Sequence, residues 1–331
     1  MWNLERHKLR TSLSVVIPTF NRGEVLLETI DYLLSQSVLP NEIIIVDQTR
    51  YNDGDPVARK LAELSDRESI HWMLKDKPSI PMAMNSGAVI AKSEWLLYID
   101  DDVRISKDFI ESHLDTITES SKLAHVGQIV QPWQQPNSNE TVQVSSSSFR
   151  ADLVFRFNHS MPAEINNCMA GNLCVNRGAL IEAGGFDENF YGVAYRFETE
   201  FCKRFCKVHD TLFYYSPKPI LNHLYIKSGG TRAHANYLTS TSPVHSMGDY
   251  YLALLHAPPL EAIGYIVKRL FTSVVAKFYL SRPWYIPARM IAEIRGLASA
   301  LKAYKKGQKL INATQLDVGK GQADQRSINA G

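Results

Sequence analysis

Four short apolar runs without polar alternation constrain the fold of this 331-residue chain more than any other feature. They cover residues 12–18, 42–46, 70–74 and 95–99, and helical spacing of apolar residues separates them at 26–34, 56–64 and 82–91. Strands that are apolar on both faces and alternate with helices indicate a parallel sheet that helices cover on both sides. We therefore predict an α/β fold with a Rossmann-like, mostly parallel sheet.

Polar residues directly follow three of these runs. Thr19, Asn21 and Arg22 follow the first, Asp47 and Gln48 follow the second, and Asp100, Asp101 and Asp102 follow the fourth. Ligands of such sheets bind beyond the carboxyl ends of the strands. We therefore expect the functional site at these residues.

The three adjacent carboxylates of Asp100, Asp101 and Asp102 indicate a cation site. Two unit charges about 4 Å apart repel by roughly 4 kcal/mol at an effective dielectric constant near 20. Carboxylate oxygens suit Mg²⁺ or Mn²⁺, and a diphosphate is a natural partner for either ion. An acidic turn that caps a helix near Ser106 is the alternative interpretation. The position after a buried strand favours the metal.

Common nucleotide-binding motifs do not occur in the sequence. It contains neither a Gly-x-x-x-x-Gly-Lys loop nor a Gly-x-Gly-x-x-Gly turn. Ordinary ATPases, kinases and dinucleotide oxidoreductases are therefore disfavoured.

Positive charge is concentrated near the end of the chain. Residues 251–310 contain ten Lys and Arg against two Glu, whereas the whole chain has a net charge of only +2. This asymmetry, together with amphipathic and aromatic-rich helices over 250–310, predicts contact with an anionic membrane surface. The aliphatic and aromatic content suits lipid better than nucleic acid, so we expect no nucleic-acid partner.

The start of the chain gives no targeting signal. The apolar run over 13–17 ends at Pro18 and is too short for a signal peptide or a membrane span. We expect a cytoplasmic protein, peripheral at the cytoplasmic face of a membrane.

Residues 12–235 contain an ordered set of short motifs. The motifs are the stretch from Val15 to Arg22 (VVIPTFNR), Ile44 to Asp47 (IIVD), Asn85 to Gly87 (NSG), the Asp triplet, Gly184 to Glu188 (GGFDE), and Glu198 to Phe201 (ETEF) with Arg204. This set resembles the inverting glycosyltransferase family 2 of the GT-A fold. The resemblance implies transfer of a sugar from a nucleotide-diphosphate donor to a glycan or lipid-linked glycan acceptor, with Mn²⁺ or Mg²⁺ as cofactor.

The resemblance also implies a division of the chain. Residues 1–240 would form the catalytic domain, with a nucleotide-sugar half over 1–130 and an acceptor half over 131–240. Residues 241–310 would form the basic amphipathic helical region, and 311–331 a disordered tail.

On the donor side, the resemblance assigns roles to residues that match the family motifs. Asp102 becomes the first metal ligand, with Asp100 and His223 beside it. The family usually has a second Asp where this chain has Gln48, which leaves the identity of the nucleotide base open. The implied donor contacts are Pro18, Thr19, Asn21, Arg22, Asp47, Gln48, Asn85, Asp100, Asp101 and Arg232.

On the acceptor side, alignment on Arg204 places Phe197 and Glu198 where the family has a Glu-Asp pair. Glu198 is therefore the expected catalytic base, and Glu200 is the second candidate. A solvated helix face paired with Lys203 and Arg204 is the alternative. The expected acceptor contacts are Trp133, Asn172 and Asp187, with core packing or turn capping as their alternative roles.

Three other function classes compete with this interpretation. Gln48 and Phe197 depart from the family pattern, which keeps a non-catalytic membrane-associated binding or scaffold protein open. A sugar nucleotidyltransferase would need a longer Gly-rich and Arg-containing loop after the first strand. A glycoside hydrolase also uses two carboxylates but needs no diphosphate site.

Overall fold

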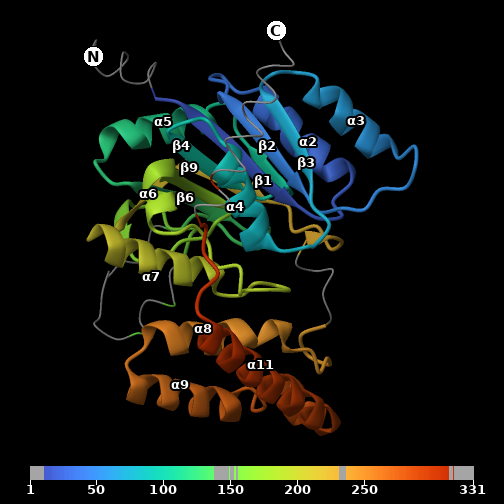
Figure 1. Cartoon of the computed structure of the whole chain (residues 1–331), viewed down its shortest axis with the longest axis vertical. Coiled ribbons are helices and arrows are strands. Elements are labelled where there is room, and N and C mark those ends of the chain that lie inside the picture. The colour runs from blue at the N-terminus through green and yellow to red at the C-terminus, as the bar shows by residue number, and fades with distance from the viewer. Residues whose placement is uncertain are drawn as a thin grey trace.

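The computed structural model describes residues 11–137, 149, 153, 156–230, 236–312 and 316. Within these residues the central element is one nine-stranded sheet, and helices cover both of its faces (Figure 1). The strand order is β3-β2-β1-β4-β8-β6-β9-β5, and β7 pairs with β9.

The first half of the sheet is regular and parallel. β1 pairs with β2 and β4, and β2 pairs with β3, all in the parallel sense. This half confirms the strands and helices that the apolar pattern predicts, with shifts of one or two residues at their ends. Its elements are β1 (Leu13–Thr19), α2 (Glu24–Leu34), β2 (Glu42–Asp47), α3 (Pro56–Ser65), β3 (Ile70–Leu74), α4 (Ile80–Ile90) and β4 (Trp95–Ile99).

The second half of the sheet is mixed. β6 and β9 are parallel, whereas β4–β8, β6–β8, β5–β9 and β7–β9 are antiparallel. The elements are β5 (Val103–Ile105), α5 (Phe109–Glu119), β6 (Ala124–Val130), β7 (Ala163–Ile165), β8 (Asn172–Asn176), α6 (Arg177–Glu182), α7 (Phe197–His209) and β9 (Phe213–His223).

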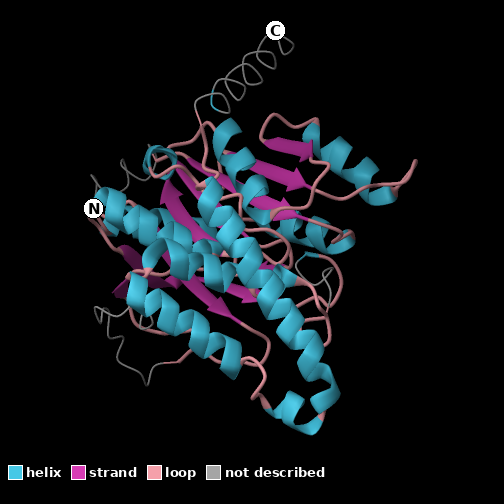
Figure 2. Cartoon of the chain, turned by 60° about the horizontal axis from the view of Figure 1, so that its bottom comes forward, coloured by secondary structure: helices cyan, strands magenta, loops and turns pink. Residues whose placement is uncertain are grey.

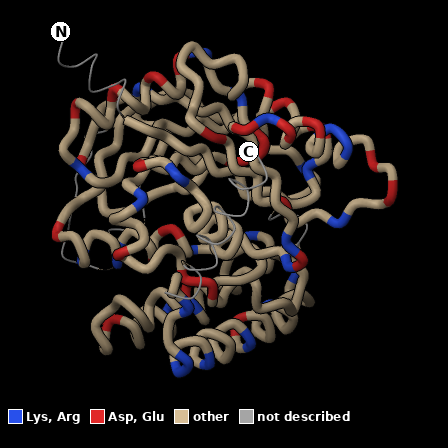
Figure 3. The backbone as a smooth tube through the Cα atoms, turned by 45° about the horizontal axis from the view of Figure 1, so that its top comes forward, with Lys and Arg blue, Asp and Glu red and all other residues tan. Residues whose placement is uncertain are grey.

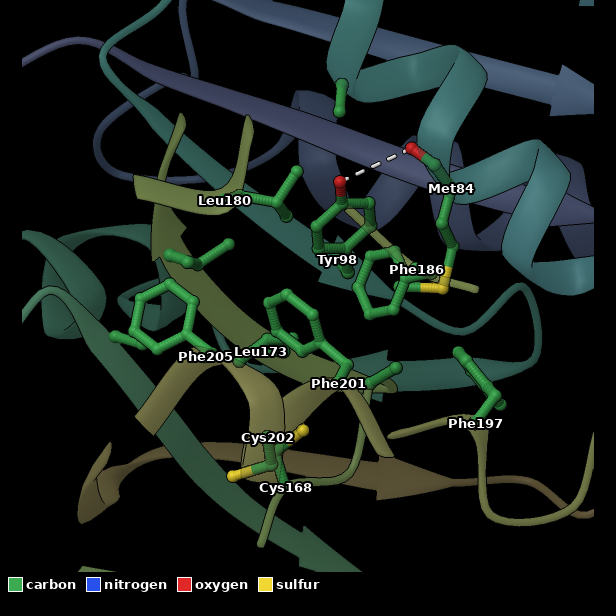
Figure 4. Packing of buried hydrophobic residues seen from close by; sticks show 14 of the residues in the cluster. Met84, Tyr98, Cys168, Leu173, Leu180, Phe186, Phe197, Phe201, Cys202 and Phe205 are labelled. Atoms are coloured by element: carbon green, nitrogen blue, oxygen red, sulfur yellow. Dashed lines mark hydrogen bonds between the residues drawn. The ribbon is translucent and has the colours of Figure 1, made fainter. Parts of the chain in front are cut away.

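Two hydrophobic clusters hold the layers together. Val15 and Ile17 of β1 face α2, α3 and α5, whereas Val16 faces α4, α6 and α7 on the other side. Figure 4 shows the second cluster, in which the hydroxyl of Tyr98 donates to the carbonyl of Met84 at 3.3 Å. Because β1, β2 and β4 are buried on both faces, they lack an alternation of apolar and polar residues, whereas β3 at the edge of the sheet is only partly buried.

Helices after the sheet pack against α7 (Figure 1), and the turned view in Figure 2 shows helices lying over the strands. Met247, Tyr250 and Tyr251 of α8 and Ala300 of α11 belong to the same hydrophobic cluster as β4 and β8. Among the described residues, no helix is both long and apolar enough to cross a membrane. The predicted division of the chain near residue 240 stays a prediction. The elements are η3 (Pro243–His245), α8 (Met247–His256), α9 (Pro259–Thr272), α10 (Lys277–Ser281), η4 (Pro283–Tyr285) and α11 (Ile286–Lys306).

A segment after α11 returns to the sheet. The backbone N–H of Lys309 donates to Asp187 at 3.0 Å, and that of Ile311 donates to the carbonyl of Gly184 at 2.8 Å. The GGFDE motif therefore anchors the end of the helical region. Of the tail predicted over 311–331, residues 313–315 and 317–331 lie outside the described residues.

Candidate active site

A cavity of about 470 Å³ lies at the carboxyl ends of β1 and β4, where the sequence predicts the site. β1 and β4 are parallel neighbours, so the turn after Thr19 and the Asp triplet meet at one edge. His223 reaches the same place because β9 runs antiparallel to β5, with His223 opposite Val103. Glu198, in the first turn of α7, lines the same cavity.

Asp102 contacts both a histidine side chain and a backbone N–H group. Its Oδ1 lies 3.1 Å from Nε2 of His223, and its Oδ2 accepts from the N–H of Ile226 at 3.0 Å. Burial alone would raise the pKa of Asp102, but the contact with His223 and the charge of Arg22 lower it below its ordinary value. Asp102 is therefore held as an anion at neutral pH.

Arg22 joins the Asp triplet after β4 to the segment that follows β9. Its Nε lies 2.7 Å from Oδ1 of Asp101, and its Nη1 donates to the carbonyl of Ser228 at 2.7 Å. A Cβ on Gly229 would lie 2.3 Å from the carbonyl oxygen of Asn21, and the φ of Gly229 is +74°, so glycine is required there. The segment after His223 is therefore closed onto the turn that follows β1. Arg232 lies outside the described residues.

Asp102 and His223 offer a donor pair that suits a divalent ion. Two ligand atoms about 2.1 Å from an octahedral ion lie roughly 3 Å apart, which is the spacing of Asp102 Oδ1 and His223 Nε2. Asp100 Oδ2 is further away, 3.8 Å from the same nitrogen. In the part of the chain that the structure describes, no three His, Cys, Asp or Glu side chains already form a closed metal site. The residues thus fit an ion that also takes ligands from a substrate.

Glu198 lies where the first turn of α7 lines the cavity. The N–H of Ala170 donates to its Oε1 at 2.8 Å. Burial raises the pKa of Glu198 to about 7; this hydrogen bond opposes the rise, and the charge of Asp100 adds to it. Glu198 can therefore exchange a proton near neutral pH.

Glu200 points away from the cavity. Its side chain is fully buried, receives hydrogen bonds from Arg204 at 2.8 and 2.9 Å, and lies 3.4 Å from Nε2 of His256. Burial opposes its ionisation, but the hydrogen bonds from His256 and Arg204 lower its pKa to about 2. The geometry separates the two candidate bases, because only Glu198 lines the cavity.

The other predicted donor residues divide into two groups. Pro18, Thr19, Arg22, Gln48, Asp100 and Asp101 line the cavity. Gln48 also links strands, because its amide donates to the carbonyl of Thr19 at 3.3 Å and accepts from the N–H of Ser79. Asp47 instead accepts from Tyr51 at 2.8 Å and Trp72 at 3.1 Å, and Asn85 is bonded to the backbone of Phe186. Asn21 adopts a left-handed φ of 54° in the turn.

Of the predicted acceptor residues, Trp133 alone lines the cavity. It is 64% exposed and its ring meets that of Tyr225 edge-on at 4.8 Å. Asn172 is buried, 2.9 Å from His113, and donates to the carbonyls of Gln128 and Pro219. Asp187 accepts from Tyr251 at 2.9 Å and anchors Lys309.

Several cavity residues were not predicted from the sequence. Tyr225 follows His223 with a left-handed φ of 58°, and Ala170 presents its backbone N–H. Val193 and Tyr195 lie in a loop whose apolar residues follow no regular spacing. Backbone groups and irregular loops leave no periodic pattern in the sequence. The nearest clue in the sequence is the aromatic residue Tyr225, two positions after His223.

The sequence profile described as Glycosyl transferase family 2 matches residues 14–182, which is half of the chain. The chain belongs to glycosyl transferase family 2. The matched range contains the Asp triplet, and α7 with Glu198 lies beyond it. The family predicted from the motifs is thus confirmed.

Named relatives of this family 2 chain are glycosyltransferases. It is 24% identical over 195 residues to Glycosyltransferase GlyG of Streptococcus pneumoniae, covering 57% of this chain and 62% of the relative. It is 27% identical over 184 residues to Glucosyl-dolichyl phosphate glucuronosyltransferase of Haloferax volcanii, covering 54% and 56%. The chain thus spans about three fifths or less of the length of these relatives.

A solved structure shares the fold. GalNAc-T7, crystallised with UDP, GalNAc and Mn²⁺, superposes with a TM-score of 0.52 at 14% identity, over 75% of this chain and 52% of that one. The predicted GT-A fold is thereby confirmed for this family 2 member.

Proposed function

We propose that this protein is an inverting glycosyltransferase that uses a nucleotide-diphosphate sugar as donor. One observation carries the proposal: Glu198 and the pair Asp102–His223 line one cavity. Glu198 can hold a proton near pH 7, whereas Asp102 is a fixed anion. Two carboxylates with such divergent environments suit different chemical roles.

The proposed reaction is a single displacement. Glu198 accepts the proton of the acceptor hydroxyl as its oxygen forms a bond to the anomeric carbon. The bond from that carbon to the donor phosphate breaks, and its electron pair leaves with the nucleoside diphosphate. Attack opposite to the leaving group inverts the anomeric configuration.

The donor would bind at the end of the cavity that contains Asp102 and His223. Asp102 and His223 would hold Mn²⁺ or Mg²⁺, and the ion would supply positive charge next to the diphosphate of the donor. Arg22 donates to the carbonyl of Ser228, and the N–H of Gly230 donates to the carbonyl of Phe20, so the segment after His223 is held against the turn after β1. Much of the rate would come from positioning both substrates.

The acceptor is proposed to be a glycan or a lipid-linked glycan. The name of the Haloferax relative refers to a dolichyl phosphate carrier, which supports the lipid-linked class. The outer face of α9 supports it independently, because Leu260, Ile263, Val267 and Phe271 are 46–86% exposed at helical spacing. Figure 3 shows Lys and Arg along the C-terminal helices. We propose that this face docks on an anionic membrane; a location at the cytoplasmic face stays a prediction.

The membrane proposal has a direct test. Phe271→Glu should abolish co-sedimentation with vesicles that contain anionic lipid, whereas Tyr304→Glu on α11, also exposed, should change it little. Equal binding by both variants would contradict docking through α9.

The transferase proposal is tested with a panel of nucleotide-diphosphate sugars and Mn²⁺, Mg²⁺ or EDTA. Turnover of one donor with a divalent ion, loss of turnover in EDTA, and an inverted product by NMR would support it. Binding of no donor with either ion would favour a non-catalytic membrane-associated protein instead. Synthesis of a sugar nucleotide from a sugar phosphate would favour a nucleotidyltransferase.

A further inference from the structure

A second cavity, of about 420 Å³, lies between the loop that precedes α7 and residues 237–269 of the C-terminal region. Its lining includes Tyr195, Tyr237 and Tyr265, the guanidinium groups of Arg196 and Arg269, the carboxylate of Asp249 and the imidazole of His245. Val193 and Tyr195 line both this cavity and the active-site cavity, so the two are neighbours. We propose that the second cavity binds a second sugar ring of the acceptor, beyond the ring that receives the transferred sugar.

The chemistry of the lining matches a sugar ring. Asp249 is buried and accepts from Arg196 Nε and from the Tyr265 hydroxyl, each at 3.0 Å. Sugar hydroxyls both donate and accept, so they suit a mixture of guanidinium, carboxylate, phenol and imidazole groups. The tyrosines add apolar surface with a polar edge, and the volume falls within the range of small-ligand sites.

The wall between the two cavities is built under constraint. Ala194 and Arg196 adopt left-handed φ values of 50° and 74° on either side of Tyr195. Non-glycine residues occupy this region at an energetic cost, and such residues cluster at functional sites. Arg196 is also the residue before α7, so the same turn positions Glu198 and the second cavity.

The C-terminal helices hold this wall in place. A Cβ on Gly248 of α8 would lie 1.8 Å from the carbonyl oxygen of Tyr195, and a Cβ on Gly192 would lie 2.6 Å from Val244. The helix α9 presents Tyr265 and Arg269 to the cavity and its apolar residues to the outside. The helical region therefore forms part of the acceptor site as well as the proposed docking face.

This inference rests on the proposed transferase function, since it names the acceptor of that same site. Remote binding of a substrate can be used at the reacting centre, so a longer acceptor should react better. The probes are methyl glycosides of glucose, galactose, mannose and N-acetylglucosamine, each paired with its disaccharide, and binding is followed by saturation-transfer NMR and by transfer rates.

We expect at least one disaccharide to bind about tenfold more tightly than its monosaccharide, with contacts to both rings. Tyr237→Ala should remove this gain and leave the monosaccharide unchanged. Tyr304→Ala is the matched control, because Tyr304 is similarly exposed, at 49% against 46%, and lines neither cavity. Tyr237 also contacts Arg289, so His245→Ala serves as the second variant if Tyr237→Ala fails to fold.

The outcomes separate the two proposals. A disaccharide gain that Tyr237→Ala or His245→Ala removes supports the second subsite, even if no donor is turned over. Transfer without any disaccharide gain, or a gain that survives in both variants, overturns the subsite and leaves the transferase function standing. A panel in which no disaccharide binds better than its monosaccharide by NMR overturns it as well.

Discussion

Two carboxylates at opposite ends of the active-site cavity lie in different electrostatic environments. At the proposed donor end, Asp102 lies beside His223 and Arg22, which lower its pKa. At the proposed acceptor end, Glu198 receives one backbone hydrogen bond, and burial raises its pKa to about 7. Burial also raises the pKa of Asp101, next to Asp102, to about 7, so the partners of each carboxylate, more than its end of the cavity, separate a fixed anion from a group that can take up a proton.

The largest effect should come from removing the proton acceptor. Glu198→Gln keeps the size of the side chain but cannot accept a proton, so kcat should fall by about 10²–10⁴. Steady-state kinetics with the identified donor checks this. A loss of less than tenfold would mean that another residue is the catalytic base.

Removal of the fixed anion should act on the donor instead. Asp102→Ala removes one of the two proposed metal ligands, so donor affinity in Mn²⁺ should fall by at least about 100-fold. Calorimetric titration of the donor measures it. Unchanged affinity in Mn²⁺, with the same response to EDTA as the wild type, would mean that Asp102 holds no ion.

The rate should depend on pH through Glu198. A base must be ionised to act, so kcat/KM should rise about tenfold per pH unit below 7 and level off above it. The profile of Glu198→Gln, measured through its residual activity, should lack this rise. A wild-type profile flat between pH 5 and 8 would contradict the role of Glu198.

Glu200 sharpens the contrast, because it lies two residues further along α7 and should affect stability rather than rate. Glu200→Gln leaves Arg204 buried without its ion pair, which costs about 3–5 kcal/mol of unfolding free energy. At temperatures where the variant is folded, kcat should change less than about threefold. Urea denaturation measures the cost, and a large fall in kcat with full stability would reverse the two assignments.

Acid unfolding provides a second readout for Glu200. Its pKa is lowered to about 2 in the folded protein from an ordinary 4.5, so its contribution is complete above that value and is lost as the pH falls between the two. Glu200→Gln should therefore lose less stability over this interval than the wild type. Identical acid curves would argue against the ion pair with Arg204.

The sequence predicted strands β1 to β4 well and the later strands less completely. Apolar residues dominate β1 to β4, so these strands can be recognised without tertiary information. β6 contains His125 and Gln128 and β9 contains Ser216 and Lys218, which interrupt any apolar pattern. His125 and Gln128 are buried through contacts that only the folded chain provides, such as the stacking of His125 on Trp95 and the bonds of Gln128 to residues 158 and 159.

The site shows the same difference. The Asp triplet, Arg22, His223 and Glu198 could be predicted because motif order places them at strand and helix ends. Glu200 could not be separated from Glu198 by sequence, since only the rotation of α7 places one in the cavity and the other against Arg204. Tyr195 and Tyr225 depend on loop conformations with left-handed residues, which the sequence does not specify.

Donor binding and sugar transfer in two variants, Asp102→Ala and Glu198→Gln, test the proposed division of the cavity most directly. We predict that Glu198→Gln binds the donor in Mn²⁺ with the affinity of the wild type but transfers almost no sugar. We predict that Asp102→Ala loses donor binding itself. Loss of donor binding in Glu198→Gln, with binding retained in Asp102→Ala, would contradict the division of the cavity into a donor end and a proton-accepting end.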